Sequence, residues 1–112
     1  MSRVRHKFNA KPVRTEDGRY FASTLQYKYH QQLLLRQKAG DVIMFLPEVS
    51  IPLVYDAEKK KWIKYRVDFL EFLSDGTCVF TEVKGMETKE YKLKKALFED
   101  LYPVKLNVVK RV

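Results

Sequence analysis

The sequence has very little cysteine and no long hydrophobic run, and both shortages narrow the class of protein. The single cysteine, Cys78, excludes an internal disulfide and a cysteine-rich zinc site, and its place in a strand-like run predicts a packing role. No run reaches the roughly 18 apolar residues of a membrane span. The N-terminus is basic and lacks the apolar core of a signal peptide. We therefore expect a cytoplasmic protein without a membrane partner.

Histidine is also scarce, which weakens the case for a histidine metal site. His6 and His30 are the only two, and neither has a second ligand at metal-binding spacing. We expect both to lie on the surface or in the N-terminal segment. Repeats, low-complexity tracts and internal linkers are missing too, which is consistent with a single domain.

The charge that is present is mostly positive and lies near the N-terminus. The formal net charge is +8, and residues 1–40 alone contribute +7. Such a concentration predicts a nucleic acid partner, because Lys and Arg neutralise backbone phosphates. The segment has no amphipathic period that would suit a membrane surface. The candidate phosphate-binding residues of this segment are Arg3, Arg5, Lys7, Lys11, Arg14 and Arg19.

The periodicity predicts an α/β fold of the α+β kind, with element order αβββαβ and a mixed sheet flanked by two helices. Residues 1–17 have no sustained period and are expected to form an irregular basic arm, followed by one domain at residues 18–112. The expected helices are residues 24–39 and 89–101. The expected strands are residues 42–55 with a kink at Pro47, 62–73, 77–84 and 104–109.

Local signals set the ends of both helices. Ser23 and Gln26 form a capping box, in which each side chain can satisfy a free backbone amide of the other. Thr88 is a candidate N-cap for the second helix. Within that helix a stripe of leucines predicts the buried face, namely Leu93, Leu97 and Leu101, with Tyr91 and Phe98 flanking the stripe.

Two carboxylates and a lysine interrupt the strand-like runs at residues 65–85. Asp68 lies between Val67 and Phe69, and Glu82 precedes Lys84 by two residues. Residues i and i+2 of a strand share a face, so Glu82 and Lys84 should project together. Two carboxylates on adjacent strands are suitable ligands for a divalent metal, with the lysine as a cationic helper.

The hairpin turn decides whether Asp68 belongs to that group. A two-residue turn at Asp75 and Gly76 would place Glu82 on the opposite face of the sheet from Asp68. A three-residue turn at residues 74–76, with Gly76 at positive φ, would instead place Asp68 directly opposite Glu82. We predict the three-residue turn. A salt-bridged surface of the sheet is the competing interpretation of these charges.

The pattern resembles the PD-(D/E)XK nuclease superfamily. Its aspartate on the second strand and Glu-x-Lys on the third match Asp68 in VDF and Glu82 and Lys84 in EVK. The chain also resembles a group of small phage-encoded, resolvase-like members. The matching segments are KFNAK, DGRYFAS, YRVDF, EVKGMET and YKLKKALF, in order along the chain.

This resemblance implies a Mg²⁺- or Mn²⁺-dependent endonuclease that cuts branched DNA, such as Holliday junctions or forks, in phage recombination or replication. Asp68, Glu82 and the carbonyl of Val83 would hold the metal, and Lys84 would stabilise charge on the phosphate. Lys94 on the second helix would contact phosphate, although a solvated lysine is the alternative. Two cuts in one junction would require a homodimer.

The sequence departs from the superfamily pattern on the first helix, where a glutamate is often found. Gln26 stands at that position, and a neutral amide supplies neither negative charge nor a proton acceptor. Gln26 could instead serve only the capping box, and Glu48 could partly replace the missing carboxylate. A non-catalytic DNA-binding module is therefore the alternative function, and an RNA-binding or protein-interaction domain is a third.

Overall fold

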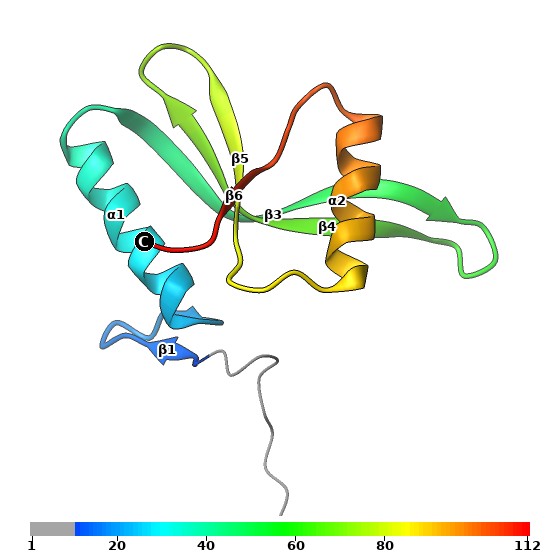
Figure 1. Ribbon diagram of the computed structural model, residues 1–112, viewed down its shortest axis with the longest axis horizontal. Coiled ribbons are helices and arrows are strands. Elements are labelled where there is room, and N and C mark those ends of the chain that lie inside the picture. The colour runs from blue at the N-terminus through cyan, green and yellow to red at the C-terminus, as the bar shows by residue number, and fades with distance from the viewer. Residues whose placement is uncertain (1–10) are drawn as a thin grey trace, which may run out of the picture.

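The computed structural model describes residues 11–112 and confirms the α+β class with a mixed sheet and two helices (Figure 1). Arg3, Arg5, Lys7 and His6 lie outside the described residues. No helix within residues 11–112 is long and apolar enough to cross a membrane. The elements in chain order are β1 (Val13–Arg14), β2 (Tyr20–Phe21), α1 (Thr24–Lys38), β3 (Val42–Asp56), β4 (Lys61–Leu73), β5 (Cys78–Val83), α2 (Lys89–Leu101) and β6 (Asn107–Val109).

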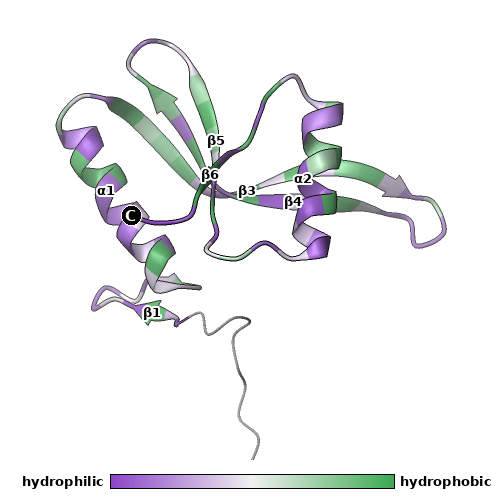
Figure 2. Cartoon of the chain, viewed as in Figure 1, coloured by the Kyte–Doolittle hydropathy of each residue, from purple (hydrophilic) through white to green (hydrophobic). Residues whose placement is uncertain are grey.

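The main sheet has four strands in the order β3-β4-β5-β6. The first three strands are antiparallel neighbours, whereas β6 pairs with β5 in parallel. Strand β3 is continuous across the predicted kink at Pro47, and Glu48 next to it has a φ of 53°, which a residue with a side chain rarely adopts. Figure 2 shows hydrophobic residues concentrated along the strands, while hydrophilic residues occupy much of both helices.

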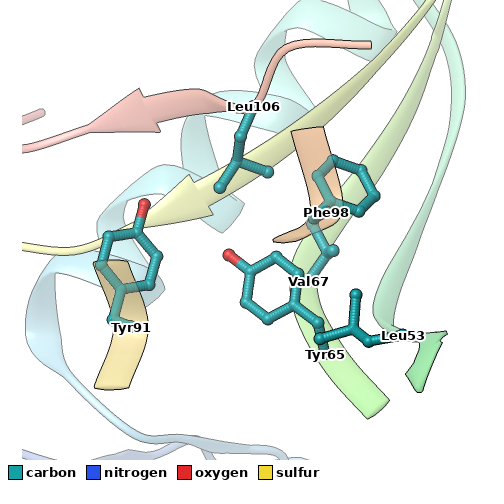
Figure 3. Packing of buried hydrophobic residues seen from close by; sticks show 6 residues of the cluster. All are labelled: Leu53, Tyr65, Val67, Tyr91, Phe98 and Leu106. Carbon is teal, nitrogen blue, oxygen red and sulfur yellow. The ribbon is translucent and has the colours of Figure 1, made fainter. Parts of the chain in front are cut away.

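Each helix covers its own part of the sheet with a separate hydrophobic core. Under α1, the buried residues are Tyr29, Leu33, Val42, Phe69 and Val83. Under α2, they are Leu53, Tyr65, Val67, Tyr91, Phe98 and Leu106, which Figure 3 shows together. Strand β4 passes from one core to the other. Asp68 therefore lies between two residues that belong to different cores.

The buried face of α2 differs from the predicted leucine stripe. Leu93 and Leu101 are exposed and Leu97 is only partly buried, whereas Tyr91 and Phe98 are buried. Tyr91 and Phe98 are seven residues apart, almost two full turns, so both point toward the sheet. The larger aromatic side chains, rather than the leucines, thus define the packed face.

The N-terminal segment and the last strand also differ from expectation. Val13–Arg14 pairs with Tyr20–Phe21 in a short hairpin, so part of the expected irregular arm is ordered structure. The last strand begins at Asn107 rather than at residue 104, because the Leu106 amide donates to the Glu99 carboxylate at 2.8 Å instead of joining the sheet. Cys78 is exposed, so the predicted packing role is wrong.

The N-cap of α1 gives a first testable prediction. The Ser23 hydroxyl oxygen accepts a hydrogen bond from the backbone amide of Gln26 at 3.0 Å, as the capping box predicted. Ser23→Ala removes this acceptor and is expected to lower the free energy of unfolding by about 1 kcal/mol. Urea denaturation checks this value, with Ser50→Ala at an exposed strand position as the control. An equal effect of the two substitutions would contradict the capping role.

Candidate metal-binding site between two strands

The turn between β4 and β5 has the predicted three-residue form. The Leu73 amide donates to the Thr77 carbonyl at 2.8 Å, and Gly76 has a φ of 89°. The register runs from Phe72 opposite Cys78 to Phe69 opposite Thr81. One step further, this register places Asp68 opposite Glu82. The predicted three-residue turn is confirmed, and its register places Asp68 and Glu82 opposite each other on adjacent strands.

Asp68 is held from two sides. Its Oδ1 accepts a hydrogen bond from Gln26 Nε2 at 3.0 Å, and its Oδ2 accepts one from the Val83 amide at 2.8 Å. The contact with Gln26 joins α1 to β4 over 42 residues of sequence. Each carboxylate oxygen has a second lone pair, so both oxygens can still accept a metal or a proton.

Gln26 uses both ends of its side-chain amide. Its Nε2 donates to Asp68, while its Oε1 accepts from the Ala22 amide at 3.0 Å. The second contact is the return bond of the capping box, displaced by one residue from the expected Ser23 amide. Gln26 therefore serves the helix cap and also contacts Asp68, so the interpretation that it serves the capping box alone is wrong.

Glu82 is the more buried of the two carboxylates, with 6% of its surface exposed. Its Oε1 accepts a hydrogen bond from the Tyr65 hydroxyl at 3.0 Å. The ring of Tyr65 packs in the α2 core beside Tyr91 (Figure 3), with 6.4 Å between the ring centroids. The core under α2 thus fixes the position of Glu82.

Burial, and repulsion from neighbouring carboxylates, make both Asp68 and Glu82 hard to ionise. Burial raises the pKa of Asp68 to about 6, against the opposing effects of the Val83 amide and the Lys84 charge. Burial and then the nearby Asp68 charge raise the pKa of Glu82 to about 7. A pair of carboxyl groups with raised pKa values in a partly buried position is typical of a functional site.

Lys84 lies close enough to lower the pKa of both carboxyl groups, but it forms no ion pair with them within 4.0 Å. Its ammonium instead lies over the ring of Tyr91, 5.0 Å from the centroid. The Tyr91 hydroxyl is buried and has no hydrogen-bond partner among the described residues. The competing interpretation of a salt-bridged surface is therefore wrong, because Glu82 is buried and Lys84 is unpaired within residues 11–112.

Glu48 adds a third carboxylate near Asp68. The pairing of Pro47 with Phe69 and of Val49 with Val67 places Glu48 opposite Asp68 on β3. Its charge raises the pKa of Asp68. Glu48 is exposed, and no group of three His, Cys, Asp or Glu side chains in residues 11–112 is arranged to hold a metal ion by itself. The candidate ligand set within this range thus stays at two carboxylates and the backbone.

A cleft of about 470 Å³ opens beside Asp68, between α1, β2, β3 and β4. Gln26, Glu48 and Asp68 line it together with aromatic residues, whereas Glu82 and Lys84 do not line it. Of the two opposed carboxylates, Asp68 is therefore reached through this cleft and Glu82 is not.

The predicted phosphate-binding residues within residues 11–112 do not all lie on one part of the molecule. Lys11 and Arg14 are exposed, and Arg19 lines the cleft. Lys94 is half-buried on α2. The basic residues of the described N-terminal segment thus lie on the side of α1 and the cleft, and Lys94 lies on the other helix.

Two buried polar residues were not predicted as such. Glu71 on β4 is 1% exposed and accepts hydrogen bonds from the Tyr29 hydroxyl at 2.5 Å and from Arg36 at 3.2 Å. Its alternation with Val67 and Phe69 is the signal that could have shown its burial. His30 is buried against Phe21, Phe45 and Phe69, so its expected surface position is wrong.

Residues 5–112 match the family model DUF1064, described as a protein of unknown function, and the chain belongs to this family. A search of curated proteins and a search of solved structures each found no match. The interpretation of the site therefore rests on its own geometry.

Proposed function

We propose that this protein is a metal-dependent DNA endonuclease of the PD-(D/E)XK kind that hydrolyses phosphodiester bonds in branched DNA. The observation that carries the proposal is the facing pair of Asp68 and Glu82, with Lys84 close to both. The excess of basic residues near the N-terminus supports DNA as the partner. A homodimer would supply the two sites that a four-way junction requires.

The donor set fits Mg²⁺ or Mn²⁺. Asp68 and Glu82 offer hard oxygen ligands on neighbouring strands, and the Val83 carbonyl would complete the protein side of the site. When bound there, the metal would activate a water molecule and stabilise negative charge on the phosphate. Its charge would also favour ionisation of two carboxyl groups whose pKa values are raised.

The remaining residues would position these ligands. Gln26 holds one oxygen of Asp68, and Tyr65 holds one oxygen of Glu82, so neither carboxylate turns freely. Lys84 would leave the ring of Tyr91 to stabilise the charged phosphate, because an unpaired ammonium beside the site is available for it. Basic residues near the cleft would follow the DNA backbone without reading bases.

A panel of labelled DNA substrates tests this function. Purified protein is incubated with a four-way junction, a fork and a linear duplex, each with Mg²⁺, Mn²⁺ or EDTA. We expect metal-dependent nicking of the branched substrates. Tight, salt-dependent binding without cleavage would favour the alternative of a non-catalytic DNA-binding module. Stronger binding to RNA, or binding with little salt dependence, would favour the third class.

Gln26→Glu tests whether the missing helix carboxylate limits the activity. The new carboxylate cannot donate to Asp68 and would repel it, so without metal the free energy of unfolding should fall by about 1 to 2 kcal/mol. With Mn²⁺, the added negative charge should raise the cleavage rate about tenfold. Gln32→Glu, at an exposed position of the same helix, is the matched control. A lower rate in Gln26→Glu at saturating Mn²⁺ would show that the neutral amide is required.

A further inference from the structure

The cleft beside Asp68 has walls that the proposed hydrolysis does not use. Besides its polar residues, it is lined by Tyr20, Phe21, Phe45 and Phe69. Its volume of about 470 Å³ lies within the range of small-molecule sites, roughly 300 to 1,000 Å³. Flat aromatic walls of this kind suit a planar ring system. The cleft is therefore shaped for a ligand other than a bare phosphate.

Tyr20 lines this cleft and lies beside two arginines, Arg14 and Arg19. It is 50% exposed although it is a large aromatic side chain. The Arg14 guanidinium lies over its ring, 5.5 Å from the centroid, and Arg19 is its neighbour in sequence. Exposed aromatic rings beside arginines commonly bind single-stranded nucleic acid, because bases stack on the rings and the arginines form ion pairs with the phosphates.

Arg19 is held in place at the cleft. Its Nη1 lies 3.3 Å from Nε2 of His30, and its Nε lies 3.5 Å from the Asp17 carboxylate. Burial, and then the charge of Arg19, lower the pKa of His30, so the neutral imidazole can accept a hydrogen bond from the guanidinium. This contact fixes a cation at the entrance.

The negative charge inside the cleft favours the base of a nucleotide over its phosphate. Glu48 and Asp68 line the cleft, and without a bound metal their negative charges would repel a phosphate. A neutral base with an amino group is compatible with them, because a carboxylate accepts hydrogen bonds from such groups. The phosphates flanking the base would remain outside, near the arginines.

We propose that this cleft binds one unpaired DNA base, which stacks on the face of Tyr20 that Arg14 leaves open, while Arg14 and Arg19 contact the flanking phosphates. The proposal rests on the proposed function only in taking DNA as the substrate. It narrows the substrate to branched DNA whose branch point presents an unpaired base next to the bond that is cut. Base-paired DNA would not enter, because its bases are stacked and paired within the duplex.

A binding experiment without metal tests the cleft separately from catalysis. Fluorescence anisotropy in EDTA compares two labelled duplexes, one with a single unpaired adenine and one with an abasic nucleotide at the same position. The two share backbone charge and shape and differ only in the base. We expect wild-type protein to bind the adenine duplex about tenfold more tightly. Tyr20→Ala should remove this preference, whereas Tyr20→Trp should retain it.

Tyr55→Ala is the matched control, because Tyr55 is 49% exposed but lies on the β3–β4 hairpin and does not line the cleft. It should bind both duplexes as wild type does. Equal affinity of wild type for the two duplexes, or a preference that survives in Tyr20→Ala, would overturn the proposal. A Tyr20-dependent preference in a protein that cleaves nothing would support the cleft and refute the nuclease. Efficient cleavage without any base preference would do the reverse.

Discussion

Asp68→Asn is expected to reduce metal-dependent cleavage of branched DNA by about a thousandfold, because it removes one of the two carboxylates proposed as metal ligands. An asparagine has a single acceptor oxygen and no charge, so it cannot replace the carboxylate as a metal ligand. It can still receive one of the two hydrogen bonds that Gln26 and Val83 donate to Asp68. Single-turnover cleavage of a labelled junction measures the effect.

Asp100→Asn is the control for this experiment. Asp100 is an exposed carboxylate on α2, and no hydrogen bond or ion pair involves it among the described residues. Its substitution removes the same charge from the protein and should leave the rate within about twofold of wild type. Both variants should bind the junction with similar affinity. Cleavage by Asp68→Asn at the wild-type rate would rule out the proposed ligand set.

The free energy of unfolding is expected to decrease as the pH rises from about 4 to 7. Asp68 and Glu82 have pKa values raised to about 6 and 7, so in this range the folded protein binds more protons than the unfolded chain. Stability therefore falls with increasing pH, the reverse of the usual behaviour of carboxylates. The combined change should be on the order of 5 kcal/mol, measured by urea denaturation at each pH.

Glu82→Gln separates this effect from general charge repulsion. The glutamine keeps an oxygen that accepts from the Tyr65 hydroxyl but cannot ionise. The slope of stability against pH should be smaller in this variant. Mn²⁺ should stabilise the wild-type protein at pH 7, because it binds the folded state, and should not stabilise this variant. Glu90→Gln, at an exposed position of α2, should keep the wild-type slope. Identical slopes in the two variants would contradict the raised pKa of Glu82.

The hairpin could be predicted from the sequence because its determinants are local. Gly76 can adopt a positive φ without strain, and a three-residue turn then fixes every pair along the two strands. The position of Asp68 opposite Glu82 follows from that turn alone. The caps of both helices were predictable for the same reason, since Ser23 and Thr88 act on amides three residues away.

The rest of the site depends on contacts between distant segments. Glu48 meets Asp68 only through the pairing of β3 with β4, whose charged connection gives no distinctive turn signal. Tyr65 lies on the packed face of β4, and its hydroxyl reaches Glu82 only because the α2 core holds its ring. Gln26 could be linked to the helix cap by spacing, but its contact with Asp68 required the placement of α1.

The packed faces were harder to predict than the elements themselves. Leucines at helical spacing suggested one face of α2, but the sheet receives Tyr91 and Phe98. His30 had no partner in sequence, yet three phenylalanines surround it. In both cases the local pattern allowed more than one face, and the tertiary packing of large aromatic rings selected among them.

Anomalous diffraction from crystals soaked in Mn²⁺ tests the central claim most directly. The account predicts one strong peak between the carboxylates of Asp68 and Glu82, within about 2.0 to 2.4 Å of an oxygen of each. The same soak of Asp68→Asn crystals should show no peak at this position. A well-occupied Mn²⁺ ion elsewhere on the chain, with none between Asp68 and Glu82, would contradict the account.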